Sequence, residues 1–131
     1  MDGYVLYALR RRSIDEDSLA VTQQEQPGMV LYALAADGRD PRIALAAAQA
    51  MADARGWTVH ERIVDRDSSV PPQDRPGWGR IRTAITSGQV RGVIALTRHH
   101  VTADDQLYTN ELRWLYVRRA VLHLVHPETH T

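Results

Sequence analysis

The chain has 131 residues, a length that allows one compact domain with one hydrophobic core. Its 16 basic and 16 acidic residues cancel, which argues against a protein whose main task is to neutralise a phosphate backbone. The absence of cysteine excludes disulfides and thiolate chemistry, and no apolar run reaches the roughly 18 residues of a membrane-spanning helix. The first residues lack the pattern of a signal peptide, so we expect a cytoplasmic domain.

Short apolar runs alternate with helical patterns from Met29 onward. The run 29–34 predicts a buried strand, and Asp40 followed by Pro41 predicts the start of a helix. Gly56 stands where a left-handed residue would end that helix. Its buried face is predicted from apolar residues at helical spacing, which are Ile43, Ala47, Ala50 or Met51, and Ala54.

The middle of the chain repeats this order of strand and helix. Alternating apolar residues predict a second strand around 57–63, and the stretch 65–73, with its serines and prolines, predicts a loop. A second helix is predicted to begin at Asp74 and to end at Ser87 and Gly88. The apolar face of this helix consists of Trp78, Ile81 and Ile85.

The last third of the chain predicts one more strand, one more helix and a final strand. The run 93–96 is apolar, Thr102 with Asp105 resembles a capping box, and a strand begins at Ala120 and ends before Pro127. This order predicts an α/β fold with three layers, in which a mainly parallel sheet carries helices on both faces. The apolar stripe expected on the last helix is Tyr108, Leu112 and Leu115.

The first 28 residues precede the predicted domain and contain a short sequence repeat. We predict that 1–28 is an extension with one strand and one helix, preceding a domain at 29–131. The run 5–9 has the same letters, VLYAL, as the run 30–34, and a capping box at Ser13 predicts the helix that follows. The extension either adds to the edge of the sheet or forms an arm that pairs with another subunit.

An ordered set of short motifs resembles the catalytic domain of serine recombinases, the resolvase and invertase family. The motifs are Tyr32-Ala33 in the first strand, the helix that carries Gln49, the sequence DRPGW around Arg75, and VIALTR ending at Arg98. Gln49 precedes Arg75 by 26 positions and Arg75 precedes Arg98 by 23, spacings similar to those of the family. The resemblance covers about residues 29–125 and implies the resolvase catalytic-domain fold.

In that family, a serine just after the first strand attacks a DNA phosphodiester, and arginines hold the phosphate. This chain has Ala36 at the matching position, so the resemblance implies a domain that cannot cleave DNA by this route. Arg75 and Arg98 remain as phosphate-binding positions, whereas the family's first-strand arginine is Leu34. Ser13 lies too far from the later motifs to replace the nucleophile, and we interpret it as a helix cap.

The resemblance therefore predicts a catalytically inactive module that binds or regulates through self-association or a protein partner. A homodimer is favoured, because the family dimerises and the last helix carries Tyr108, Trp114 and Tyr116. The family's long helix, which leads to a DNA-binding domain, is not expected in this sequence. Alternatives are DNA binding without cleavage, residual recombinase activity, and a phosphate or nucleotide site at the carboxyl ends of the strands.

Several charged clusters have plainer interpretations. Arg75 and Arg98 could instead be structural partners of carboxylates such as Asp65 or Asp67. The run 10–12 of three arginines is interpreted as a solvated turn. We predict no cofactor and no metal site, because the histidines lack the spacing of metal ligands and are expected to be solvated. These histidines are His99, His100, His123, His126 and His130.

Overall fold

The computed structural model describes residues 28–127. The predicted extension, with its repeated run 5–9, lies outside the described residues apart from Gly28. In chain order, the elements are β1 (Gly28–Leu34), α3 (Arg42–Arg55), β2 (Val59–Asp65), η1 (Pro72–Asp74), α4 (Pro76–Thr86), β3 (Val90–Ala95), η2 (Arg98–His100), α5 (Asp105–Val117) and β4 (Val121–Leu124).

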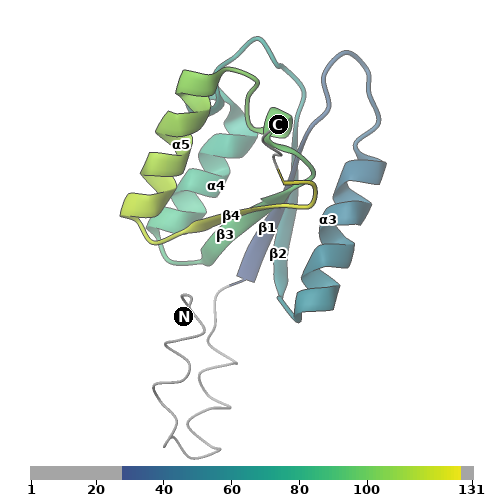
Figure 1. The fold of residues 1–131 in the computed structure, drawn as a ribbon, viewed down its shortest axis with the longest axis vertical. Coiled ribbons are helices and arrows are strands. Elements are labelled where there is room, and N and C mark those ends of the chain that lie inside the picture. The colour runs from purple at the N-terminus through teal and green to yellow at the C-terminus, as the bar shows by residue number, and fades with distance from the viewer. Residues whose placement is uncertain (1–27, 128–131) are drawn as a thin grey trace, which may run out of the picture.

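The four strands of this region form one sheet in the order β2-β1-β3-β4, with every neighbouring pair parallel (Figure 1). Met29 lies level with Val59 on one side and with Gly92 on the other, and Gly92 lies level with Val121. All four strands therefore begin at the same end of the sheet. The predicted parallel α/β architecture is confirmed.

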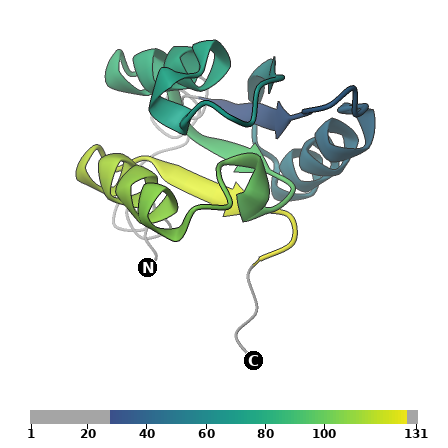
Figure 2. The ribbon, with the colours of Figure 1, turned by 90° about the horizontal axis from the view of Figure 1, so that it is seen from above.

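Helices cover both faces of the sheet, which makes three layers (Figure 2). On one face, α3 packs against β1 and β3 through Met29, Leu31, Ala48 and Ile94. On the other face, α4 and α5 enclose a larger core that contains Tyr32, Trp78, Ile81, Val93 and Leu115. β1 is buried on both faces, as its unbroken apolar run predicts. None of the helices within residues 28–127 has the length and apolarity needed for a membrane span.

The predicted buried face of α3 is wrong by about one residue. The buried residues are Ala44, Ala48 and Ala52, whereas Ile43 is 79% exposed. Alanine occupies so much of this helix that the apolar spacing does not select one face. Packing decides instead, because Ala48 and Ala52 allow the helix to approach the sheet closely. The predicted left-handed end is confirmed, since Gly56 has φ 72°.

The two helices on the opposite face follow the sequence more closely. The α4 face of Trp78, Ile81 and Ile85 is buried as predicted. In α5, the cap is Asp104, whose carboxylate accepts a hydrogen bond from the Leu107 N–H at 2.9 Å, so the predicted capping box is wrong. The predicted stripe is also wrong at one position: Leu112 is 39% exposed. The residues that α5 buries are Tyr108, Glu111 and Leu115.

Candidate functional site

A cavity of about 420 Å³ lies at the carboxyl ends of β1 and β3, where parallel sheets place their ligand sites. The loop between β1 and α3 forms one wall, and the segment that connects β3 to η2 forms another. Its lining combines apolar groups with a guanidinium, hydroxyls, imidazoles and the carboxylates of Asp37 and Asp40. The residues that supply this chemistry are Ala36, Arg39, Ser68, Thr97, His99 and His100.

Ala36, the position that resembles the recombinase nucleophile, lies in the wall of this cavity. Its methyl group cannot attack a phosphodiester. Two hydroxyl side chains do line the same cavity: Ser68, from the loop after β2, and Thr97, after β3. Ser68 could not be recognised from the sequence, because a serine in a polar loop carries no distinguishing pattern.

The loop between β1 and α3 turns sharply beside the cavity, and its Asp40 carboxylate is paired with the Arg42 guanidinium. Asp37 and Gly38 are both left-handed, with φ of 55° and 76°. Asp40 accepts a hydrogen bond from the Arg42 N–H at 2.9 Å and pairs with the Arg42 guanidinium at 2.7 Å. These hydrogen bonds lower the pKa of Asp40. The predicted start of the helix is one residue too early, because α3 begins at Arg42 with Pro41 at its N-cap.

His100 connects η2 to the end of β1. Its Nδ1 accepts a hydrogen bond from the Leu34 N–H at 2.9 Å, so in the neutral ring the proton resides on Nε2. Burial, followed by the neighbouring charges of His99 and Arg39, lowers the pKa of His100. The expectation that this histidine is solvated is therefore wrong. Its neutral ring offers one N–H donor at the cavity wall.

Arg75 is buried and joins the loop after β2 to the loop after β3. Its Nε donates to the Val70 carbonyl at 2.9 Å. Its Nη1 donates to the carbonyls of Val101 at 2.6 Å and His100 at 3.2 Å, and to the Tyr32 hydroxyl at 3.3 Å. The guanidinium is thus held by main-chain oxygens, outside the lining of the cavity that contains Ala36.

Asp65, at the end of β2, completes the same buried network. Its carboxylate accepts hydrogen bonds from the Tyr32 hydroxyl at 2.7 Å and from the backbone N–H groups of Gly77 at 2.8 Å and Trp78 at 2.9 Å. Burial, and then the bond to Asp65, raise the pKa of Tyr32 above its usual range. Asp65 therefore reaches Arg75 through the Tyr32 hydroxyl, and it stabilises the positive end of α4.

Arg98 and Gln49 lie away from this network. Arg98 is mostly buried, with its Nη2 3.0 Å from an Asp105 carboxylate oxygen and its guanidinium carbon 4.2 Å from the Tyr108 ring centre. Gln49, on α3, accepts a hydrogen bond from Arg62 at 2.6 Å. The structure therefore brings Tyr32 and Arg75 together but leaves the other predicted positions apart.

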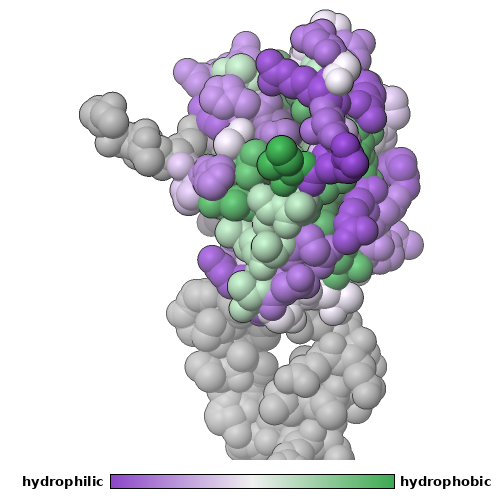
Figure 3. Space-filling view, turned by 90° about the vertical axis from the view of Figure 1, so that its right-hand side faces the viewer, coloured by the Kyte–Doolittle hydropathy of each residue, from purple (hydrophilic) through white to green (hydrophobic). Residues whose placement is uncertain are grey.

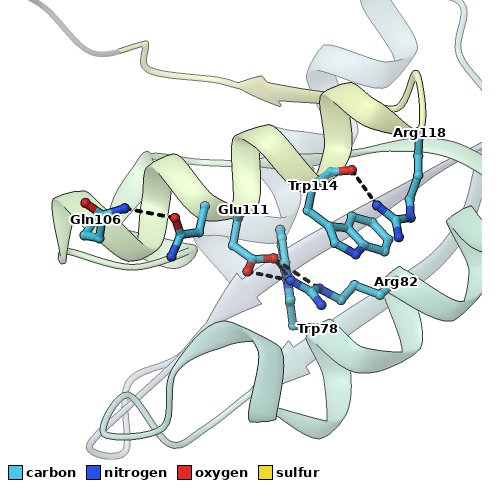
Figure 4. Close-up of polar contacts among 7 residues, drawn as sticks. Trp78, Arg82, Gln106, Glu111, Trp114 and Arg118 are labelled. Atoms are coloured by element: carbon cyan, nitrogen blue, oxygen red, sulfur yellow. Dashed lines mark hydrogen bonds and ion pairs between the residues drawn. The ribbon is translucent and has the colours of Figure 1, made fainter.

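The two tryptophans of α4 and α5, Trp78 and Trp114, make packing and polar contacts between the helices (Figure 4). The Trp78 Nε1 donates to the buried Glu111 carboxylate at 2.7 Å, and Arg82 donates to the same carboxylate at 2.7 Å. The guanidinium carbons of Arg82 and Arg118 lie 4.6 and 4.0 Å from the centre of the Trp114 ring. Trp114 is thus already stacked on cations, which supports a packing role over base stacking.

Histidines elsewhere in the described region do not form a metal centre. No group of three histidine, aspartate or glutamate residues within 28–127 is arranged to hold a metal ion. His123 stacks on Trp57 with ring centres 4.4 Å apart, and burial lowers its pKa, so its predicted solvation is wrong. His130 lies outside the described residues.

The domain is an α/β protein with three layers, a parallel sheet and a cavity at the carboxyl ends of its strands. Within that class, the fold is similar to serine recombinase catalytic domains, as the sequence resemblance implies. The catalytic domain of TP901-1 integrase matches with a TM-score of 0.67 at 14% identity, over 75% of this chain and 76% of that one.

Two IS607-like serine recombinases show the same likeness. The catalytic domain of ISC1926 TnpA, an IS607-like serine recombinase, matches with a TM-score of 0.67 at 16% identity, over 77% of this chain and 72% of that one. The catalytic domain of IS1535 TnpA, also IS607-like, has a TM-score of 0.61 at 18% identity, over 77% and 73%. No protein-family model and no curated protein matches the sequence.

Proposed function

We propose that this domain is a catalytically inactive, recombinase-like module that acts by self-association or by contact with a protein partner. The observation that carries the proposal is Ala36, a methyl group in the cavity wall where the resemblance requires a nucleophile. Arg75 supports it, because its Nε and Nη1 already donate to main-chain carbonyls of the protein itself. The neutral net charge of the chain also disfavours a role centred on DNA.

The test for inactivity is a search for a covalent protein–DNA adduct with supercoiled and nicked DNA. We expect no adduct. An adduct that disappears in Ser68→Ala or Ser13→Ala, but persists in Ser69→Ala, would overturn the proposal and identify the nucleophile. Ser69 is the matched control, because its hydroxyl donates to Asp67 at 2.6 Å and does not line the cavity. A gel shift at low salt tests DNA binding without cleavage, and we expect no retarded DNA.

Partner contact is supported by an exposed apolar face on α3. Figure 3 shows hydrophobic residues gathered on this side of the molecule. Ile43 is 79% exposed there, and Ala46 and Ala50 are exposed on the same helix. By contrast, the aromatic interface predicted on α5 retains only Tyr116 at the surface, because Tyr108 is buried in the core.

Self-association is tested by light scattering over a concentration series. We expect a dimer that Ile43→Glu converts to a monomer, because a charge on the α3 face would lose its water in the interface. Arg113→Glu, an exposed change on α5, is the control and should leave the dimer intact. A wild-type monomer mass at every concentration would refute self-association and leave contact with a different protein.

A second candidate function is binding of a small anion in the cavity beside Ala36. The specific observation is that donors line this cavity: the Arg39 guanidinium, the hydroxyls of Ser68 and Thr97, and the imidazole of His100. The carboxylates of Asp37 and Asp40 line it as well, and Asp40 is paired with Arg42. Phosphate and nucleoside monophosphates should then raise the melting temperature of the wild type, and less so that of Arg39→Gln. Sodium chloride at equal ionic strength is the control. Equal shifts for both proteins would dispose of this site.

A further inference from the structure

The two edges of the sheet differ in chemistry. The outer edge strand β2 carries charged side chains: Glu61 pairs with Arg80 of α4, and Arg62 donates to Gln49 of α3. The other edge strand, β4, has the sequence VLHL and pairs with β3 alone among the described strands. Edge strands that lack charges and proline readily accept another strand. β4 is therefore the edge that is open to pairing.

An apolar surface adjoins this open edge. Of the large hydrophobic side chains exposed within residues 28–127, Leu112, Tyr116 and Val117 all lie in the second half of α5, with Tyr116 82% and Val117 68% exposed. A cavity of about 490 Å³ follows, where α5 turns into β4 beside Ala120 and Val121. Arg119 lines this cavity as well. We call the apolar part of this surface the α5–β4 groove, which consists of Leu112, Tyr116, Val117, Ala120 and Val121.

The chain enters the sheet at the same end as this groove. Gly28 begins β1, and Val121 of β4 lies level with Gly92 and so with Met29. Figure 1 shows β1 beginning at the end of the molecule where α5 gives way to β4. Since neighbouring strands are about 4.8 Å apart, the start of β1 is only about 10 Å from the start of β4.

A segment suited to this edge precedes Gly28. Residues 5–9 have the sequence VLYAL, which as residues 30–34 makes up most of the buried central strand β1. The 18 residues 10–27 connect this run to β1, and a connection of that length reaches up to about 60 Å. The connection is therefore long enough for residues 5–9 to pair with β4 in a parallel or an antiparallel direction. Such a tether also holds the run near the groove at an effective concentration in the millimolar range.

We propose that residues 5–9 of the same chain pair with the outer edge of β4 and cover the α5–β4 groove with their apolar side chains. The segment would then close the one uncharged edge of the sheet and leave the α3 face for a partner. This inference does not rest on the proposed function, because it concerns contacts within one chain.

The test uses the absence of native cysteine. Tyr7→Cys is combined either with Tyr116→Cys, in the groove, or with Ala54→Cys, exposed in the last turn of α3. Ala54 is a matched control, because α3 ends beside the start of β2 and so lies at the same end of the sheet. We expect an intrachain disulfide with Tyr116→Cys to form at least about tenfold faster than one with Ala54→Cys, because docking raises the local concentration at one site only.

Two outcomes of the disulfide test overturn the proposal. Similar rates for both pairs would show a segment with no preferred site. A disulfide that links two chains, seen as a dimer band on a non-reducing gel, would assign the groove to a second copy.

Hydrogen exchange gives an independent readout on the full chain. Tyr7→Pro removes a backbone donor and is incompatible with a paired strand, whereas Tyr7→Val keeps strand character. We expect the amides of β4 to exchange at least about tenfold faster in Tyr7→Pro than in the wild type or Tyr7→Val, with β2 unchanged. Equal exchange from β4 in all three proteins would overturn the proposal. Loss of self-association in Ile43→Glu would bear only on the proposed function.

Discussion

At the scale of single residues, the buried carboxylate of Asp65 is surrounded by hydrogen-bond donors. It is 6% exposed and accepts hydrogen bonds from the Tyr32 hydroxyl and the N–H groups of Gly77 and Trp78. Every partner is a donor, so the site fits a carboxylate and not an amide. Asp65 thereby links β1, β2 and the start of α4.

Asp65→Asn should lower the free energy of unfolding by about 2–3 kcal/mol, because an amide NH₂ would face backbone donors and a charge-assisted bond would be lost. Urea denaturation followed by tryptophan fluorescence measures the change. Asp67→Asn, two residues further along the chain and exposed, is the control. A loss as large in the control would show that the effect is not specific to the buried network.

His100 should make stability depend on pH. Because its pKa is lowered in the folded state, the unfolded chain binds the proton more readily. The stabilisation is complete above the ordinary histidine pKa of about 6.5, and is lost as the pH falls from there through the lowered value. His123, also lowered by burial, acts in the same direction.

His100→Asn keeps an acceptor for the Leu34 N–H and removes the titration. The free energy of unfolding, measured by urea denaturation at a series of pH values, should therefore fall less for this variant than for the wild type below pH about 6.5. A profile of His100→Asn parallel to the wild type would contradict a neutral, buried His100.

At the scale of elements, the start of α4 depends on a glycine. A Cβ at Gly77 would stand 2.6 Å from Ile63 Cγ2 and 2.7 Å from both Asp65 carboxylate oxygens, whereas one at Gly79 would meet nothing within 4 Å. The motif that resembles a recombinase phosphate site thus has a packing function: Arg75 is buried, Pro76 begins α4, and Gly77 lets β2 approach.

The two glycines of α4 should respond in opposite directions. Gly77→Ala should destabilise the fold by about 2 kcal/mol or more, because the clash displaces the Asp65 cap. Gly79→Ala should stabilise it by about 0.5–1 kcal/mol, because alanine loses less backbone entropy in a helix. Thermal unfolding followed by circular dichroism measures both changes. The same sign in both variants would refute the account of the helix start.

At the scale of the whole molecule, Arg75 holds the carboxyl edge of the sheet together. Its donors reach β1 through Tyr32, the loop after β2 through Val70, and the loop after β3 through Val101. These connections are far apart in sequence and share no local pattern. The buried Arg75 guanidinium therefore fixes the positions of the segments next to the cavity, although it does not line the cavity itself.

Arg75→Gln should lower the free energy of unfolding by about 3 kcal/mol or more, because several buried carbonyls lose a charged donor. Arg66→Gln is the control, since Arg66 is exposed and makes a single hydrogen bond, to the Arg39 carbonyl. Urea denaturation of both variants is the measurement. An Arg75→Gln protein as stable as the wild type would mean that this arginine is available for another purpose, such as holding a phosphate.

Sequence patterns predicted the positions of helices and strands better than they predicted which residues those elements bury. Trp78, Ile81 and Ile85 identify the buried face of α4, because large apolar residues at helical spacing leave one solution. In α3 the alanines leave several solutions, and the wrong face was predicted. Glu111 looks like an exposed helical residue, and only its contacts with α4 explain its burial.

The sequence by itself determined the order of strands and helices and the parallel sheet, because these follow from local periodicity. Only the tertiary structure decided the use of Arg75, the neutral state of His100 and the cavity they adjoin. Most of the hydrogen bonds involved join distant positions: the one between Arg75 and His100 spans 25 positions, and the one between Leu34 and His100 spans 66. Contacts at such separations arise from packing the layers together, which no local pattern encodes.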